Sequence, residues 1–110
     1  MYEVKVLGFF QYYTKFAIHF GMRMFSLTDS GYPTVFALGY CSHRTNEVVV
    51  CRVGNWKERL LHELGHVSGL KHNYTKGNIM HPWGLFRGID GVNEIKTLLG
   101  SDYDYYQSFL

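Results

Sequence analysis

The sequence has little cysteine and no surplus of charge of one sign. Two cysteines, Cys41 and Cys51, are too few for the disulfide framework of a small secreted domain. We expect both to be small buried side chains, although they flank a predicted hairpin and could be neighbours across it. The formal net charge is +2, with 11 basic and 9 acidic residues scattered along the chain. No basic run could neutralise several phosphates, so nucleic acid is not an expected partner.

Long hydrophobic runs are also absent. The opening stretch MYEVKVLGFF lacks the basic start and apolar core of a signal peptide. No window approaches the ~18 apolar residues of a membrane span. These absences predict a cytoplasmic protein without a membrane partner. What the sequence does have is 46% hydrophobic and 17% aromatic residues over 110 positions, a composition typical of one packed globular domain.

Hydrophobic periodicity and turn residues predict a mixed fold. Strands are expected at 2–7, 22–27, 34–41 and 46–53, and helices at 11–20, 54–69 and 92–100. The turn formers at 28–33 separate two of the strands, and SHRT joins the last two as a hairpin. The expected fold class is α/β (α+β), with a small twisted mixed sheet of three to five strands. One helix backs this sheet, and a second helix carries the motif described next.

The stretch HELGHVSGLKH, which begins at His62, has the spacing of a metal-binding helix. His62 and His66 are four residues apart, about one helical turn, so both imidazoles project from one face. Leu60, Leu64 and Val67 fall on the other side and are expected to pack against the sheet. The histidine face should then open into a cleft.

The ends of this helix are also predicted by the sequence. Asn55 can cap the start, with Glu58 three residues later in the position that reaches back to the cap. On a continuous helix His72 would lie ~15 Å along the axis from His62, at ~1.5 Å per residue. Gly69 can end the helix in a left-handed conformation, which allows the chain to turn back and bring His72 to the other two histidines.

Three neutral imidazoles leave one open position on a tetrahedral zinc ion, which is typical of a catalytic site. The sequence therefore predicts one catalytic Zn²⁺ bound by His62, His66 and His72. Glu63 lies on the flank of the same face, near the ion without binding it. As general base it would take a proton from the water on the zinc and then pass that proton to the leaving amine. The competing interpretation is a surface helix with solvated histidines.

The motif HELGHVSGLKH at 62–72, followed by NIMHP at 78–82, resembles the metzincin clan of zinc metallopeptidases. Met80 matches the methionine of the turn that lies below the metal in that clan, and the ending formed with Pro82 resembles the matrixin branch. VFALGY, EVVVCRV and WKERLLHELGH are similar to archaemetzincins. The cysteines that hold a second zinc in archaemetzincins are replaced by Asn73 and Asn78, so no second zinc is expected.

The resemblance covers roughly 33–100 and implies a division of the single domain 1–110. Residues 1–69 would form the sheet and the zinc helix, and 70–110 would form a lower part with the third ligand, the Met-turn and the last helix. The implied function is a zinc-dependent endopeptidase acting on a peptide or protein that pairs with an edge strand from 34–53. Trp83, Leu85 and Phe86 would then line a pocket that prefers a hydrophobic side chain after the cleaved bond.

Three alternatives stay open at this stage. In a gluzincin-like peptidase, Glu94 would replace His72 as the third ligand. A catalytically inactive zinc-binding module would act through a partner. A latent enzyme would place Cys41 or the C-terminal tail in the open position of the metal. The remaining histidines, His19, His43 and His81, are expected to be solvated or ordinary structural residues, with His81 at the surface.

Overall fold

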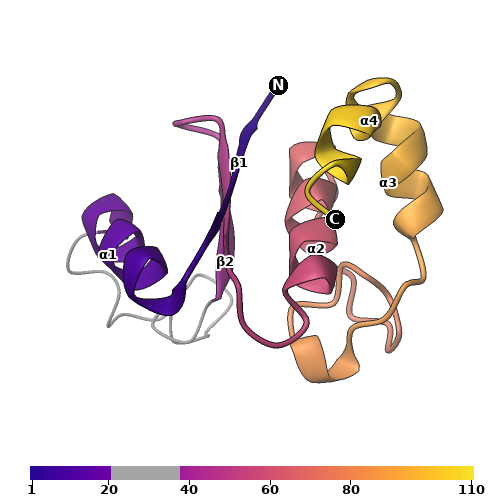
Figure 1. Ribbon diagram of the computed structural model, residues 1–110. Coiled ribbons are helices and arrows are strands. Elements are labelled where there is room, and N and C mark those ends of the chain that lie inside the picture. Colours follow the sequence, from indigo (N-terminus) through magenta and orange to yellow (C-terminus); the bar gives the residue numbers. More distant parts are fainter. Residues whose placement is uncertain (21–37) are drawn as a thin grey trace.

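The computed structural model describes residues 1–20 and 38–110, without the side chain of Phe20. The elements follow one another as β1 (Glu3–Leu7), α1 (Phe9–Phe20), β2 (Gly39–Ser42), β3 (Glu47–Cys51), α2 (Trp56–Val67), η3 (Gly84–Phe86), α3 (Val92–Leu99) and α4 (Asp102–Gln107) (Figure 1). The strand predicted at 22–27, the turn at 28–33 and the first part of the strand at 34–41 lie outside the described residues. The other predicted elements are present at nearly the expected positions.

The described strands form one mixed sheet with the order β1-β3-β2. β1 runs parallel to β3 with Val4 opposite Val48, and β2 runs antiparallel to β3 with Tyr40 opposite Val49. The predicted hairpin is therefore confirmed, and its turn contains Asn46 at a φ of 54°. A parallel pair requires a long crossover between its strands, and α1 lies in that connection.

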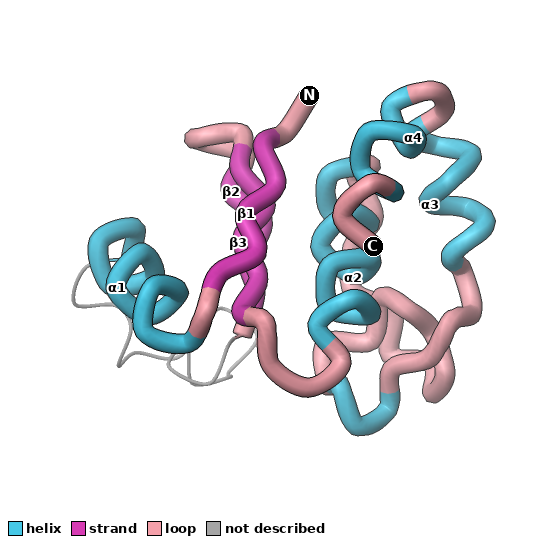
Figure 2. Tube along the Cα trace, in the orientation of Figure 1, coloured by secondary structure: helices cyan, strands magenta, loops and turns pink. Residues whose placement is uncertain are grey.

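Helices cover both faces of the sheet (Figure 2). Alternate residues of a strand point to opposite faces, so β3 contributes to two separate cores. On one face Val48 and Val50 pack with Leu60 and Leu64 of α2, and all four are fully buried. On the other face the core consists of Tyr12, Phe16, Tyr40, Val49 and Cys51. The predicted packing of the apolar side of α2 against the sheet is thus confirmed.

The two cysteines lie on opposite faces of the sheet. Cys41 packs beside the α2 core, whereas Cys51 belongs to the α1 core. Both thiols are free, and the register places Cys41 opposite Val48. The expectation of small, largely buried side chains holds, but the two residues are not neighbours across the hairpin because an odd register offset turns them to different faces.

The C-terminal part of the chain packs on the face of α2 that is turned away from the sheet (Figure 1). Ile95 of α3 and Tyr106 of α4 are almost completely buried in the same core as α2. The Tyr2 backbone N–H donates to the Tyr106 hydroxyl at 2.8 Å, which ties the tail to the first strand. No helix among the described residues combines the length and the apolar character needed to cross a bilayer.

Candidate metal centre

The start of α2 differs from the prediction in one respect. Asn55 does occupy the position before the first helical residue, but its side chain makes no capping hydrogen bond. Its φ and ψ of −81° and 57° lie outside the extended region that a capping side chain requires. The first backbone bond is present, because the Arg59 N–H donates to the Asn55 carbonyl oxygen at 3.1 Å. The helix start is therefore in the predicted place without the predicted cap.

The end of α2 follows the prediction closely. Gly69 has a φ of 96°, in the left-handed region where a Cβ is unfavourable. The Leu70 N–H donates to the Gly65 carbonyl at 2.9 Å, and the Gly69 N–H donates to the His66 carbonyl at 3.1 Å. This pair of bonds is the Schellman ending of a helix. It reverses the chain direction within two residues of the helix, which allows His72 to return toward it.

The three predicted ligands come together in the structure. Their candidate ligand atoms all lie within 4.8 Å of one another, and together His62, His66 and His72 form a group that could hold a metal ion. The distances between ring centroids are 4.9 Å for His62 and His66, 5.3 Å for His62 and His72, and 5.0 Å for His66 and His72. Ligand atoms at ~2.0–2.1 Å from one tetrahedral ion are ~3.4 Å apart. A group whose ligand atoms lie within 4.8 Å is therefore of about the size that one ion needs.

Backbone carbonyls fix the orientation of two of these imidazoles. His62 Nδ1 lies 2.8 Å from the Ile79 carbonyl oxygen, and His66 Nδ1 lies 2.9 Å from the Leu70 carbonyl oxygen. A carbonyl oxygen only accepts, so each Nδ1 must carry the proton. The lone pair of the neutral ring is then on Nε2, the atom left for a metal. Both rings have the outer hydrogen bond that orients histidine ligands in metal sites.

Burial keeps the histidines neutral. His62 is only 4% exposed, and desolvation lowers its pKa from 6.5 to about 2. Burial also lowers the pKa values of His66 and His72. Metal ligands must be deprotonated, so a low pKa favours the form that binds an ion. The histidine face of α2 is consequently more enclosed than the open cleft that the sequence pattern predicts.

Glu63 lies beside this group without being part of it. Its side chain is directed toward the start of β2, where a Cβ built on Gly39 would be 3.4 Å from Glu63 Oε2. The residue is 7% exposed, and burial raises the pKa of its carboxyl from 4.5 to about 7, against the opposing influence of Arg87 and Arg59. The ion pairs within the described ranges involve Glu3 and Glu47 and leave Glu63 out. The carboxylate thus remains available to bind or move a proton.

Met80 packs against α2, the helix that carries His62 and His66. It is 3% exposed, and a Cβ added at Gly65 would overlap its sulfur atom. The Met80 N–H donates to Asn78 Oδ1 at 2.8 Å, and its carbonyl accepts the Asn73 N–H at 3.0 Å. The Asn78 side chain and the Asn73 backbone therefore hold the turn by hydrogen bonds. Gly65 was not among the residues predicted for this site, although a glycine inside an amphipathic helix is unusual and indicates close packing.

His81 is not at the surface, and that expectation was wrong. The side chain is 7% exposed and packs against Phe86, with 5.5 Å between ring centroids. The Trp83 backbone N–H donates to His81 Nδ1 at 3.0 Å, so the neutral ring carries its proton on Nε2. That ring has no lone pair to offer at Nε2, and His81 is not a member of the three-histidine group. Of the expected pocket residues nearby, Trp83 and Leu85 are exposed.

Arg87 is a second residue that sequence reasoning missed. Its Nε donates to the His81 carbonyl at 3.0 Å and its Nη2 donates to the Pro82 carbonyl at 3.1 Å. The guanidinium group therefore braces the chain directly after Met80. Its positive charge lowers the pKa values of His62 and Glu63.

Two other residues considered as ligands remain outside the group. Glu94 is exposed on α3 and is not near enough to bind the same ion as the histidines. Cys41 is also not a member, and burial raises the pKa of its thiol to about 12. A protonated thiol is a poor ligand, so the structure gives no support to a centre blocked by Cys41.

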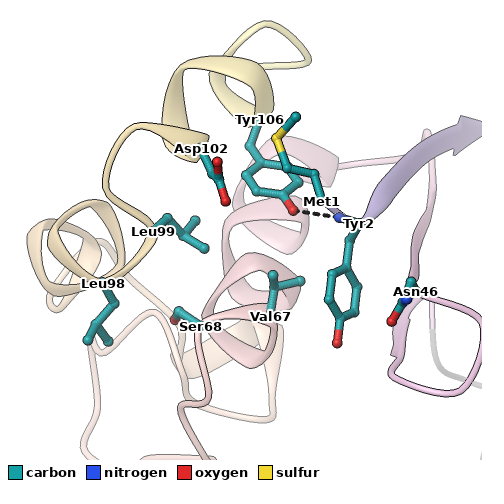
Figure 3. Close-up of a pocket in the computed structure, with 9 residues that line it drawn as sticks. All are labelled: Met1, Tyr2, Asn46, Val67, Ser68, Leu98, Leu99, Asp102 and Tyr106. Carbon is teal, nitrogen blue, oxygen red and sulfur yellow. Dashed lines mark hydrogen bonds between the residues drawn. The ribbon is translucent and has the colours of Figure 1, made fainter.

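One cavity of the described structure lies away from the histidine group. It has a volume of about 400 Å³ and is formed where the N-terminal residues, the end of α2 and the two last helices meet (Figure 3). Its lining consists of Met1, Tyr2, Asn46, Val67, Ser68, Leu98, Leu99, Asp102 and Tyr106. None of the three histidines and no part of the Met80 turn contributes to it.

Comparisons with known families and proteins leave the function open. No family model, no curated protein and no solved structure matches this chain. What can be stated from the described residues is a mixed α/β fold with a three-histidine group that could hold a metal ion.

Proposed function

We propose that the protein is a metzincin-like, zinc-dependent endopeptidase. The observation that carries the proposal is the juxtaposition of three clustered imidazoles with a buried carboxylate that is not a ligand. Two of the imidazoles have their tautomer set by backbone carbonyls, so their Nε2 atoms face the group unprotonated. A helix with solvated surface histidines would need none of these features.

The donor set favours zinc over other common ions. Neutral imidazole nitrogen suits Zn²⁺, whereas Mg²⁺ and Ca²⁺ prefer oxygen ligands. A structural zinc site usually has four protein ligands, and the described part of the chain offers three. Three protein ligands leave one position for a reactant. A divalent ion held by His62, His66 and His72 supplies positive charge that polarises a carbonyl group and acidifies water.

Glu63 is suited to move the proton. A general base works best when its pKa is near the operating pH, and burial raises the Glu63 pKa to about 7. A cation beside it lowers that value again, which keeps the carboxylate ionised at neutral pH. In peptide hydrolysis Glu63 would accept a proton from the attacking water and donate it to the leaving amine.

The edge of the sheet offers a place for an extended peptide. β2 pairs with β3 on one side, and no other described strand pairs with it. Gly39, the first residue of β2, lies against Glu63. A peptide added to this edge by backbone hydrogen bonds would pass the carboxylate, and such pairing tolerates many side chains. This arrangement supports an endopeptidase over an enzyme that acts on small molecules.

The test is a paired measurement on purified wild-type and Glu63→Ala proteins. Metal content is measured by mass spectrometry, and hydrolysis is followed with a library of quenched fluorescent peptides. We expect one zinc per chain in both proteins and cleavage by the wild type alone. Chelation should abolish cleavage, and added zinc should restore it. One zinc in both proteins with cleavage in neither would favour a zinc-binding module, and absence of zinc would refute the metal site itself.

A further inference from the structure

Four charged residues act on one another beside the candidate centre. Arg87 and Arg59 both lower the pKa of Glu63, and Glu58 raises the pKa of both arginines. The two positive and two negative charges balance, so a divalent ion would give this group a net positive charge. Cations close to a metal site oppose binding of the ion, so an arginine kept here needs a reason. The two arginines differ in what their guanidinium groups contact.

Arg59 is bonded to the segment that precedes α2. It is on α2, and its Nη2 donates to the carbonyl oxygens of Cys51 and Val53 in the segment that leads into the helix. These bonds connect the strand to the helix and explain the residue without a ligand. Arg59 thus links the strand to the helix through Nη2, while its buried Nε has no hydrogen-bond partner among the described residues.

Arg87 is hydrogen-bonded to the turn that contains Met80. The same turn provides the Ile79 carbonyl that orients His62 and the Met80 sulfur that contacts Gly65. Nε and Nη2 of Arg87 are fixed by two carbonyls, and no described residue bonds to Nη1. The bound guanidinium thus has a set orientation, and two N–H groups on Nη1 remain for another acceptor.

We propose that Arg87 binds a carboxylate of the substrate, so that the enzyme acts on anionic peptides. This inference rests on the proposed peptidase function and names its substrate class. A guanidinium that is already fixed loses little conformational freedom when it binds a carboxylate, and charge-assisted hydrogen bonds of this kind are strong. The carboxylate is either that of a Glu or Asp side chain next to the cleaved bond or the C-terminal carboxylate of a peptide, and the experiment below distinguishes the two. The resemblance to metzincins had implied a hydrophobic preference after the cleaved bond instead.

The experiment uses one cleavable parent peptide taken from the library and four versions of it. Two versions carry Glu or Gln after the cleaved bond, and two others have a free or an amidated C-terminus near that bond. The enzymes are zinc-loaded wild type, Arg87→Gln and Arg87→Lys. Arg52→Gln is the matched control, because Arg52 is an exposed arginine that lies over the ring of Trp56.

We expect wild type to prefer one carboxylate version over its neutral partner by ~10- to 100-fold in kcat/KM, the range of one charge-assisted bond. The Glu and Gln pair identifies a side-chain carboxylate, and the free and amidated pair identifies a C-terminal one. Arg87→Gln should remove the preference, and Arg87→Lys should keep a reduced part of it. An equal loss of kcat/KM for all four peptides in Arg87→Gln would show that Arg87 only stabilises the turn, and it would overturn the proposal. A preference for the carboxylate version that survives in Arg87→Gln would overturn it as well.

A binding measurement separates this inference from the proposed function. Fluorescence anisotropy of the labelled peptides is measured with Glu63→Ala and with Glu63→Ala/Arg87→Gln, both zinc-loaded, so that hydrolysis is not needed. Tighter binding of the carboxylate version in the first protein and equal binding in the second would support Arg87 even without cleavage. Equal binding of the charged and neutral peptides by Glu63→Ala would overturn the inference while leaving the peptidase proposal intact.

Discussion

The sulfur of Met80 occupies the space that the Cβ of any residue other than glycine would need at position 65. This contact joins the turn under the candidate centre to the helix that carries two of its histidines. Gly65 has no unusual φ that would require glycine, so the close approach of Met80 is the reason for it.

Gly65→Ala should therefore destabilise the protein, although alanine favours helix by ~1 kcal/mol over glycine. We expect a net loss of about 1–3 kcal/mol in the free energy of unfolding, measured by urea denaturation, because the added methyl group overpacks the core. Gly84→Ala is the control, since a Cβ at Gly84 meets no atom within 4 Å. The double variant Gly65→Ala/Met80→Ala should lose less stability than the sum of the losses in the two single variants. Additive effects of the two changes would argue against the contact.

His72 and His81 should differ in their effect on metal binding. His72 belongs to the ligand group, whereas the Nε2 of His81 carries a proton. We expect His72→Ala to weaken zinc binding by at least ~100-fold, about a fifth of the binding free energy of a typical zinc site. His81→Ala and Glu94→Ala should keep the zinc affinity within a few-fold of wild type. Competition with a chromophoric chelator measures all three, and zinc loss in Glu94→Ala would revive the gluzincin-like alternative.

The stability of the metal-free protein should respond to the charge of Glu63. The pKa of Glu63 rises from 4.5 in the unfolded chain to about 7 in the folded protein. The stability that comes with the protonated carboxyl is therefore fully present below pH 4.5 and is lost as the pH rises through 7. Glu63→Gln should thus raise the free energy of unfolding at pH 8 by ~3 kcal/mol, and by ~1 kcal/mol or less at pH 5. Urea denaturation with a chelator present measures both. A gain that is independent of pH would show that ionisation is not the cause.

Gly39 should matter for activity more than for folding. A Cβ there would lie 3.1 Å from Val50 Cγ1, a tight contact, and 3.4 Å from Glu63 Oε2, an ordinary one, so relief of the Val50 contact shifts the strand beside the carboxylate. We expect Gly39→Ala to lower kcat about tenfold or more, as ~1 Å shifts of catalytic groups do, with KM changed less. Zinc content and the urea midpoint should stay close to wild type. Unchanged kcat would mean that Glu63 does not act from this position.

The parts of the site that could be predicted from the sequence are those that depend on neighbours along the chain. His62 and His66 share a helix face because of their spacing, and Gly69 ends the helix because its left-handed conformation is a local property. The mixed α/β class, the β2–β3 hairpin and the end of α3 at Gly100 follow from local patterns in the same way.

The parts that were missed depend on contacts between distant residues. Gly65 is explained by Met80, fifteen positions later, and the burial of His81 depends on the path of the chain up to Arg87. The helix α4 has no apolar periodicity in DYDYYQ, and Tyr106 is buried through packing against the rest of the domain. Asn55 does not cap the helix because of its backbone conformation, which could not be predicted from the residue type.

The hydrogen bond from Tyr2 to the Tyr106 hydroxyl spans 104 positions of the chain. Closing so large a loop costs more chain entropy than closing a local one, by ~0.6 kcal/mol for each doubling of its length. Docking of α4 is thus expected late in folding, after the sheet and α2 have formed. The same tail should also be the first part to open in the native state, and its amide hydrogens should exchange with solvent before those of β3. Fluctuations of the C-terminus would then leave the histidine group assembled.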